Sequence, residues 1–253
     1  MLAEATLLFI FLGVCAGILI GAAGIGGVIL VPLLVYFAGA DIHQSIASSN
    51  FCFLISGIVG TVLYTKRRII KWEYIANLTY GAIPGALMGT ALLHVFDAMS
   101  LKLIIGALCI FSACKELSLK PAKVAVEETE PKKPELFFIG LVTGSLSALS
   151  GTGGPLVLIP LLALTSIPLL ITIGLAQVIQ LPIAITATLS NTITGLINWP
   201  MAAAIAVGIS FGTFLGSEAS KKISTEFLRK LVAFLLILAG TLISGLALKE
   251  QYF

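Results

Sequence analysis

The chain has 253 residues, of which 58% are apolar and only 11% are charged, and its mean hydropathy is +1.09. Since soluble domains carry about 25% charged residues, this composition excludes an ordinary soluble protein. The net charge of +3 is too small to suggest a nucleic-acid partner. Apolar runs of ~20 residues, the length that spans a bilayer as a helix, cover nearly the whole sequence without strand alternation. The chain is therefore predicted to be an all-α polytopic protein whose main partner is the lipid bilayer.

The predicted segments fall into the same series in each half of the chain. A first segment (5–22; 135–149) meets a Gly-rich break, and a short apolar piece too short to span alone follows (28–39; 155–166). A long segment (43–65; 168–197) and two ordinary spans complete each half (73–93 and 100–117; 199–217 and 225–248). Residues 118–134 are rich in Pro, Lys and Glu, which is typical of a solvated linker. We expect a first repeat at 1–117, a polar linker at 118–134 and a second repeat at 135–253.

An internal repeat supports this division. A shift of 127 residues places eight glycines of the first half on glycines of the second. The pairs are Gly13/Gly140, Gly17/Gly144, Gly24/Gly151, Gly26/Gly153, Gly27/Gly154, Gly81/Gly208, Gly85/Gly212 and Gly89/Gly216. Chance would give about one such pair, so the repeat is treated as real.

The basic residues indicate how the repeats are oriented. If the first two pieces of each half form a hairpin that enters and leaves on one side, each half crosses three more times and the second repeat is inverted. The 15 Lys and Arg residues then divide 13 to 2, whereas a broken span with parallel repeats gives 10 to 5. Cytoplasmic loops concentrate Lys and Arg. The sequence therefore predicts two inverted repeats in a cell (inner) membrane, with both termini outside and the basic loops and linker cytoplasmic.

The two Gly-rich breaks form the candidate binding site. Pro155 stands where a first helical residue belongs, so a short helix starts at the break, and a helix N-terminus carries roughly +0.5 charge. With inverted symmetry, two such ends would face one another near the midplane and bind an anion without Lys or Arg. The candidate residues are Gly24, Gly26 and Gly27 in the first break, and Thr152, Gly153 and Gly154 in the second. The alternative is that these glycines only permit tight helix packing, which is the preferred interpretation of Gly81, Gly85, Gly89 and their repeat copies.

Further polar residues lie at membrane depth beside the breaks. Ser49, Asn50, Gln177 and Gln180 are the candidates, and Asn50 and Gln177 are repeat partners. Such groups either contact the ligand or bond to neighbouring helices. No Asp or Glu lies at mid-span, so no buried carboxylate proton relay is evident, and the four cysteines form no CxxC pair, so no zinc site is indicated. We expect no catalytic residue, metal site or cofactor.

The sequence resembles the TauE/SafE family of membrane permeases. The resemblance is carried by GAAGIGGVILVPLL (21–34) and its second-half copy LSGTGGPLVLIPLL (149–162), and by the doubled unit around a polar linker. It implies transport of small sulfur-containing anions such as sulfite, thiosulfate-like species, sulfoacetate and other organosulfonates. Some related thiosulfate-permeable proteins rely on cysteines in the path, and here only Cys52 lies beside a candidate residue, Asn50.

The leading hypothesis is a transporter, either a secondary carrier or a channel-like permease, and not an enzyme. One alternative is a non-transporting membrane assembly factor, whose glycine motifs would tolerate Ala. Another is an intramembrane serine hydrolase built on Ser150, which would need a His within hydrogen-bond reach. Both carrier and channel mechanisms, and both a monomer and a homo-oligomer, stay open at this point.

Overall fold

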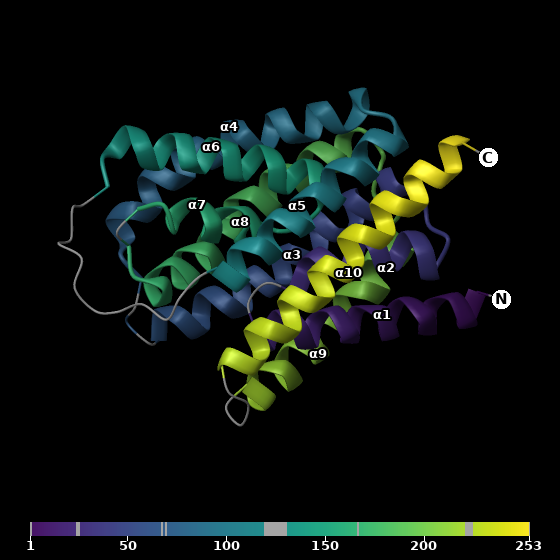
Figure 1. Cartoon of the computed structure of the whole chain (residues 1–253), viewed down its shortest axis with the longest axis horizontal. Coiled ribbons are helices and arrows are strands. Elements are labelled where there is room, and N and C mark those ends of the chain that lie inside the picture. Colours follow the sequence, from purple (N-terminus) through teal and green to yellow (C-terminus); the bar gives the residue numbers. More distant parts are fainter. Residues whose placement is uncertain are drawn as a thin grey trace.

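The computed structural model describes residues 2–23, 26–66, 68, 70–118, 131–165, 167–220 and 225–252. Over these ranges the regular secondary structure is entirely helical. Seven of the described helices are long and apolar enough to cross a membrane: α1, α3, α4, α5, α8, α9 and α10. The predicted all-α polytopic class is confirmed (Figure 1).

The two halves contain their helices in the same order. The first half comprises α1 (Leu2–Ala23), the 3-10 helix η1 (Gly26–Ile29), α2 (Leu30–Phe37), α3 (Ile42–Lys66), α4 (Trp72–Val95) and α5 (Ala98–Ser118). The second comprises α6 (Lys133–Ser150), α7 (Pro155–Leu162), α8 (Leu169–Ile193), α9 (Trp199–Ser220) and α10 (Thr225–Tyr252). The predicted segment 168–197 was too long, because α8 ends at Ile193 and Gly195 follows with φ +71°. Most of the predicted linker 118–134 lies outside the described residues.

Glycine faces hold the first helix of each half against the fourth helix of the other. A Cβ placed on Gly17 of α1 would lie 3.0 Å from the Cα of Gly212 in α9, and one on Gly13 would lie 3.2 Å from that of Gly208. In the second pair of helices, a Cβ on Gly89 of α4 would lie 3.0 Å from the Cβ of Ala148 in α6. Only residues without a side chain let two helix backbones approach this closely. The predicted packing role is confirmed for Gly89, Gly208 and Gly212, and Gly13 and Gly17 pack in the same way.

The third helices of the two halves, α3 and α8, pack against each other in antiparallel directions. Near the middle of α3, the Gln180 side-chain amide donates a hydrogen bond to the Phe53 carbonyl. One turn later along α3, a Cβ placed on Gly57 would lie 3.0 Å from the Leu181 side chain. Further along α3, Thr61 donates to the carbonyl of Gln177, and Tyr64 lies beside Gly174. From Gly57 to Tyr64 along α3 the contacting residues of α8 fall from Leu181 to Gly174, so these two helices run in opposite directions.

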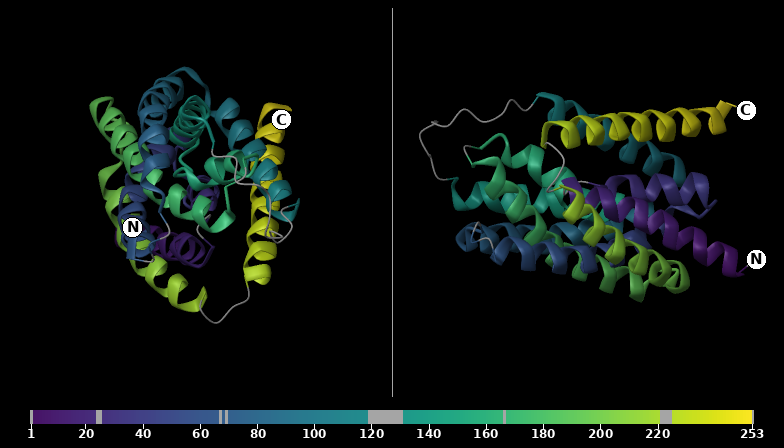
Figure 2. Two further views of the ribbon diagram at one scale, coloured as in Figure 1. Left: turned by 90° about the vertical axis from the view of Figure 1, so that its left-hand side faces the viewer. Right: turned by 90° about the horizontal axis from the view of Figure 1, so that it is seen from below.

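The two chain termini lie at the same end of the molecule (Figures 1 and 2).

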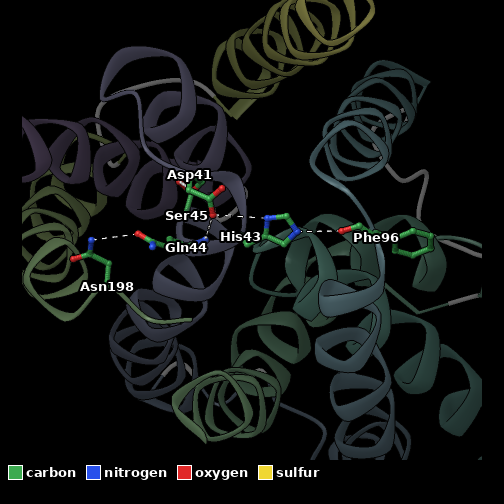
Figure 3. Close-up of polar contacts among 6 residues, drawn as sticks. All are labelled: Asp41, His43, Gln44, Ser45, Phe96 and Asn198. Atoms are coloured by element: carbon green, nitrogen blue, oxygen red, sulfur yellow. Dashed lines mark hydrogen bonds and ion pairs between the residues drawn. The ribbon is translucent and has the colours of Figure 1, made fainter. Parts of the chain in front are cut away.

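A polar cluster joins the start of α3 to the α4–α5 and α8–α9 connections (Figure 3). His43 Nε2 lies 3.1 Å from the carbonyl oxygen of Phe96, and Asn198 Nδ2 donates to Gln44 Oε1 at 3.4 Å. Just beyond Phe96, Asp97 caps α5, and hydrogen bonds from the Ser100 side chain and nearby backbone hold the pKa of its carboxyl below the ordinary value. These contacts hold the α4–α5 and α8–α9 connections against the start of α3.

Candidate functional site

The second Gly-rich break separates α6 from α7. Gly151, Gly153 and Gly154 have φ values of +63°, +78° and +103°, a region that side chains of L-residues rarely adopt. Pro155 then occupies the first turn of α7, where its missing N–H removes no helical hydrogen bond. The Gly154 carbonyl accepts from the N–H groups of Val157 and Leu158, which closes the first turn. The predicted start of a short helix at Pro155 is confirmed.

The first Gly-rich break follows α1. Helix α1 ends at Ala23, and the chain resumes at Gly26 as a 3-10 turn that leads into α2. Gly24 lies outside the described residues. The described part of this break is therefore the backbone of Gly26 and Gly27, and α1 does not continue through it as an α-helix.

The two breaks meet inside the molecule. A Cβ placed on Gly27 would lie 3.4 Å from the carbonyl oxygen of Thr152, although the two residues belong to different halves. Helix α1 starts at one end of the long axis and stops near its middle, and α6 starts at the other end (Figure 1). The 3-10 turn that leads into α2 thus lies next to the break that precedes α7, in the interior of the molecule.

A phenylalanine ring lies between the breaks. A Cβ on Gly27 would overlap the Cε1 and Cζ atoms of Phe53, and one on Gly153 would lie 2.6 Å from its Cγ. Phe53 comes from α3 and is 2% exposed. The glycines at both positions therefore make room for this ring, which neither the predicted anion site nor the alternative of tight helix packing had included.

The α3 candidates lie one turn before Phe53. Asn50 is buried, and its Nδ2 donates to the carbonyl of Ala148 at 3.0 Å. Ala148 is in the last turn of α6, whose carbonyls lack intrahelical partners, so Asn50 caps that helix end. Ser49 is fully buried, and its hydroxyl has no hydrogen-bond partner within the part of the chain that the structure describes.

The α8 candidates occupy two different positions. Gln180 Nε2 donates to the Phe53 carbonyl at 2.8 Å and to Ser56 Oγ at 2.6 Å. Its Cα also lies 3.7 Å from where a Cβ on Gly154 would be, so Gln180 borders both the ring and the second break. Gln177 lies instead against Gly60 of α3. The predicted pair of Asn50 and Gln177 is thus placed against different elements, α6 for one and α3 for the other.

Hydroxyl groups line the end of α6. Thr152 Oγ1 lies 2.9 Å from Ser150 Oγ, and Ser150 Oγ also donates to the Leu146 carbonyl. Ser150 is therefore engaged by a threonine and a carbonyl, and His43 lies at one end of the bundle on Phe96. This arrangement gives no support to a serine hydrolase.

Uncharged groups make up the buried polar surface. Among the described residues the buried polar side chains are all Ser, Thr, Asn or Gln. Several of their hydroxyls have no described partner, including those of Ser48 on α3 and of Thr143 and Ser147 on α6. Cys52 is turned to α9, where its Sγ lies 3.5 Å from the Ala202 carbonyl. An anion in this interior would be held by neutral donors and helix N-termini, without a cysteine of α3 at the breaks.

The internal repeat pairs Phe53 with a residue of a different kind. Phe53 and Gln180 are 127 residues apart and so are repeat partners, yet one is aromatic and the other is a carboxamide. Neighbouring repeat pairs such as Ser49/Ala176 also differ, so this mismatch by itself does not mark the ring in the sequence.

Known proteins place the chain in a family. The family model described as "Sulfite exporter TauE/SafE" matches residues 8–243. The chain is 28% identical to a probable membrane transporter protein of Methanocaldococcus jannaschii, over 92% of this chain and 93% of that protein. It is 23% identical to the probable membrane transporter protein YunE of Bacillus subtilis, over 92% of this chain and 95% of YunE. No solved structure matches significantly.

The names of the family and of these relatives indicate membrane transporters and not enzymes, and the chain aligns with nearly the full length of both relatives. The family match covers both Gly-rich breaks and all the long helices except the ends of α1 and α10. The chain therefore belongs to the TauE/SafE family of membrane transport proteins.

Proposed function

We propose that this protein carries small sulfur-containing anions, such as sulfite, sulfoacetate or other organosulfonates, across the cell membrane. The anion binds near the midplane, between the N-termini of α2 and α7. The observation that carries the proposal is the meeting of the two Gly-rich breaks, in which Gly27 of the first half approaches the Thr152 carbonyl of the second. Two positive helix ends that converge in a buried, uncharged interior favour a small anion.

An inverted arrangement of the repeats belongs to this proposal. It is supported by the antiparallel packing of α3 and α8, which are equivalent helices of the two halves. Parallel repeats would run these two helices in the same direction. The 13 to 2 division of basic residues favours the same arrangement, with the termini outside and the basic loops in the cytoplasm.

Flux through proteoliposomes tests the substrate class. Purified protein is reconstituted, and uptake of sulfite and of sulfoacetate is measured with and without a pH gradient. Uptake above that of protein-free vesicles is expected, and a dependence on the gradient would indicate a coupled carrier. If no sulfite, sulfoacetate or other sulfonate moves under either condition, the substrate assignment is wrong.

A substitution at the second break tests the site. Gly153→Leu is expected to abolish flux, because φ is +78° there and any side chain would enter the space between the breaks. Gly245→Leu is the matched control, since Gly245 lies on α10 with no atom within 4 Å of its built Cβ. Both variants are checked for folded protein by size-exclusion chromatography. Normal flux through folded Gly153→Leu protein would contradict the proposed site.

A further inference from the structure

The Phe53 ring fills the space that an anion between the breaks would need. Its tip lies against Gly27 of the first break, and its Cγ, Cδ1 and Cδ2 atoms lie against Gly153 of the second. With 2% of its surface exposed, the Phe53 side chain is itself buried at this position. An anion that reaches both helix N-termini must displace the ring.

The backbone of Phe53 is held in place independently of its ring. The Phe53 carbonyl accepts hydrogen bonds from Gln180 Nε2 at 2.8 Å and from Ser56 Oγ at 3.3 Å. The Gln180 bond joins α3 to α8 at the level of the breaks, whereas the Ser56 bond lies within α3. The ring itself contributes no polar contact, so rotation of one side chain opens the space while the helix–helix contact stays in place.

An unpartnered donor lies one turn from the ring. Ser49 precedes Phe53 by four residues, which places both on the same face of α3, and helical side chains lean toward the N-terminal turn. The Ser49 hydroxyl is completely buried and lacks a partner among the described residues. Buried hydroxyls in folded proteins nearly always have one, so an oxygen-rich ligand or water that enters when the ring moves would satisfy it.

We propose that Phe53 is the gate of the transport path, with its ring occupying the anion position in the occluded state shown here. This inference rests on the proposed function and adds the residue that opens and closes the site. The gate is single, because the repeat partner of Phe53 is Gln180, whose amide is engaged with the Phe53 carbonyl and Ser56. One aromatic ring thus serves both halves of the transporter.

Thiol accessibility tests the gate without any knowledge of the substrate. Cys15, Cys52, Cys109 and Cys114 are replaced by Ala or Ser, and Thr152→Cys is introduced as a reporter at the second break. The reagent is the anionic sulfonatoethyl methanethiosulfonate, applied to reconstituted protein. Because minor conformations are typically populated at ~0.1–10%, opening the site permanently should raise the labelling rate by about tenfold or more in Phe53→Ala.

A matched control comes from the same helix. Phe51 packs edge-on against Trp199, with ring centroids 5.4 Å apart, and Phe51→Ala also removes a ring from α3. It should leave the labelling rate of Thr152→Cys unchanged. Phe53→Leu, which retains most of the apolar volume, should give an intermediate rate and serves if Phe53→Ala does not fold.

The outcomes separate the gate from the substrate assignment. Faster labelling in the Phe53 variants alone supports the gate, even if the wild-type protein moves no sulfonate. Equal labelling in wild-type, Phe53→Leu and Phe53→Ala backgrounds overturns the gate, even if the wild-type protein transports sulfite. A similar rise in Phe51→Ala also overturns it, because loosened packing would then explain the effect.

Discussion

At the scale of single residues, Asn50 connects the two halves through one hydrogen bond. Its amide supplies the donor that the Ala148 carbonyl would otherwise lack at the end of α6. Asn50→Ala is expected to destabilise the protein by about 1–3 kcal/mol, because a buried carbonyl is left without a partner. Thermal unfolding in detergent measures this. Asn77→Ala is the control, since Asn77 makes an equivalent but exposed bond to the Glu73 carbonyl. Equal melting temperatures for the two variants would contradict a capping role for Asn50.

At the scale of helices, the glycine faces set how closely the halves pack. Gly85 of α4 lies against the Leu141 carbonyl of α6, and Gly212 of α9 lies against the Val14 carbonyl of α1. Gly85→Val and Gly212→Val should each force a helix pair apart and lower the yield of folded protein, because the two contacts are equivalent in the repeat. Fluorescence-detected size exclusion gives that yield, with Gly245→Val as the tolerated control. Loss of folded protein in only one of the two variants would mean that the two faces are not equivalent.

At the scale of the whole molecule, the fold predicts which connections share a membrane side. Arg68 and Lys132 are exposed beside basic segments, whereas His94 and Thr194 are exposed just before Phe96 and Asn198 along the chain. In a cysteine-free protein, a membrane-impermeant maleimide added to intact cells should label His94→Cys and Thr194→Cys only. The reason is that basic loops stay in the cytoplasm. Labelling of Arg68→Cys in intact cells, or of one residue from each pair, would contradict the inverted arrangement.

Much of the fold could be predicted because its signals are local. Apolar length identified the long helices, and Gly-rich runs followed by Pro155 identified the interruption before α7. The end of α8 was misplaced by four residues, since Thr194–Ile197 are apolar or weakly polar and hydropathy alone does not mark the turn at Gly195. Of the candidate residues, Gly27, Thr152 and Gly153 lie where the breaks meet, whereas their role in binding stays a prediction.

The sequence by itself determined the membrane class, the doubled order of helices and the position of the breaks, because each depends on neighbouring residues along the chain. Only the tertiary structure decided which polar groups face which helix. Asn50 bonds 98 residues away to α6, Gln180 bonds 127 residues away to Phe53, and Gln177 lies against Gly60. Those partners depend on how helices from two halves rotate and approach, which the hydropathy of neither helix specifies. The same packing placed an aromatic ring between glycines that, in the sequence, look like an open anion site.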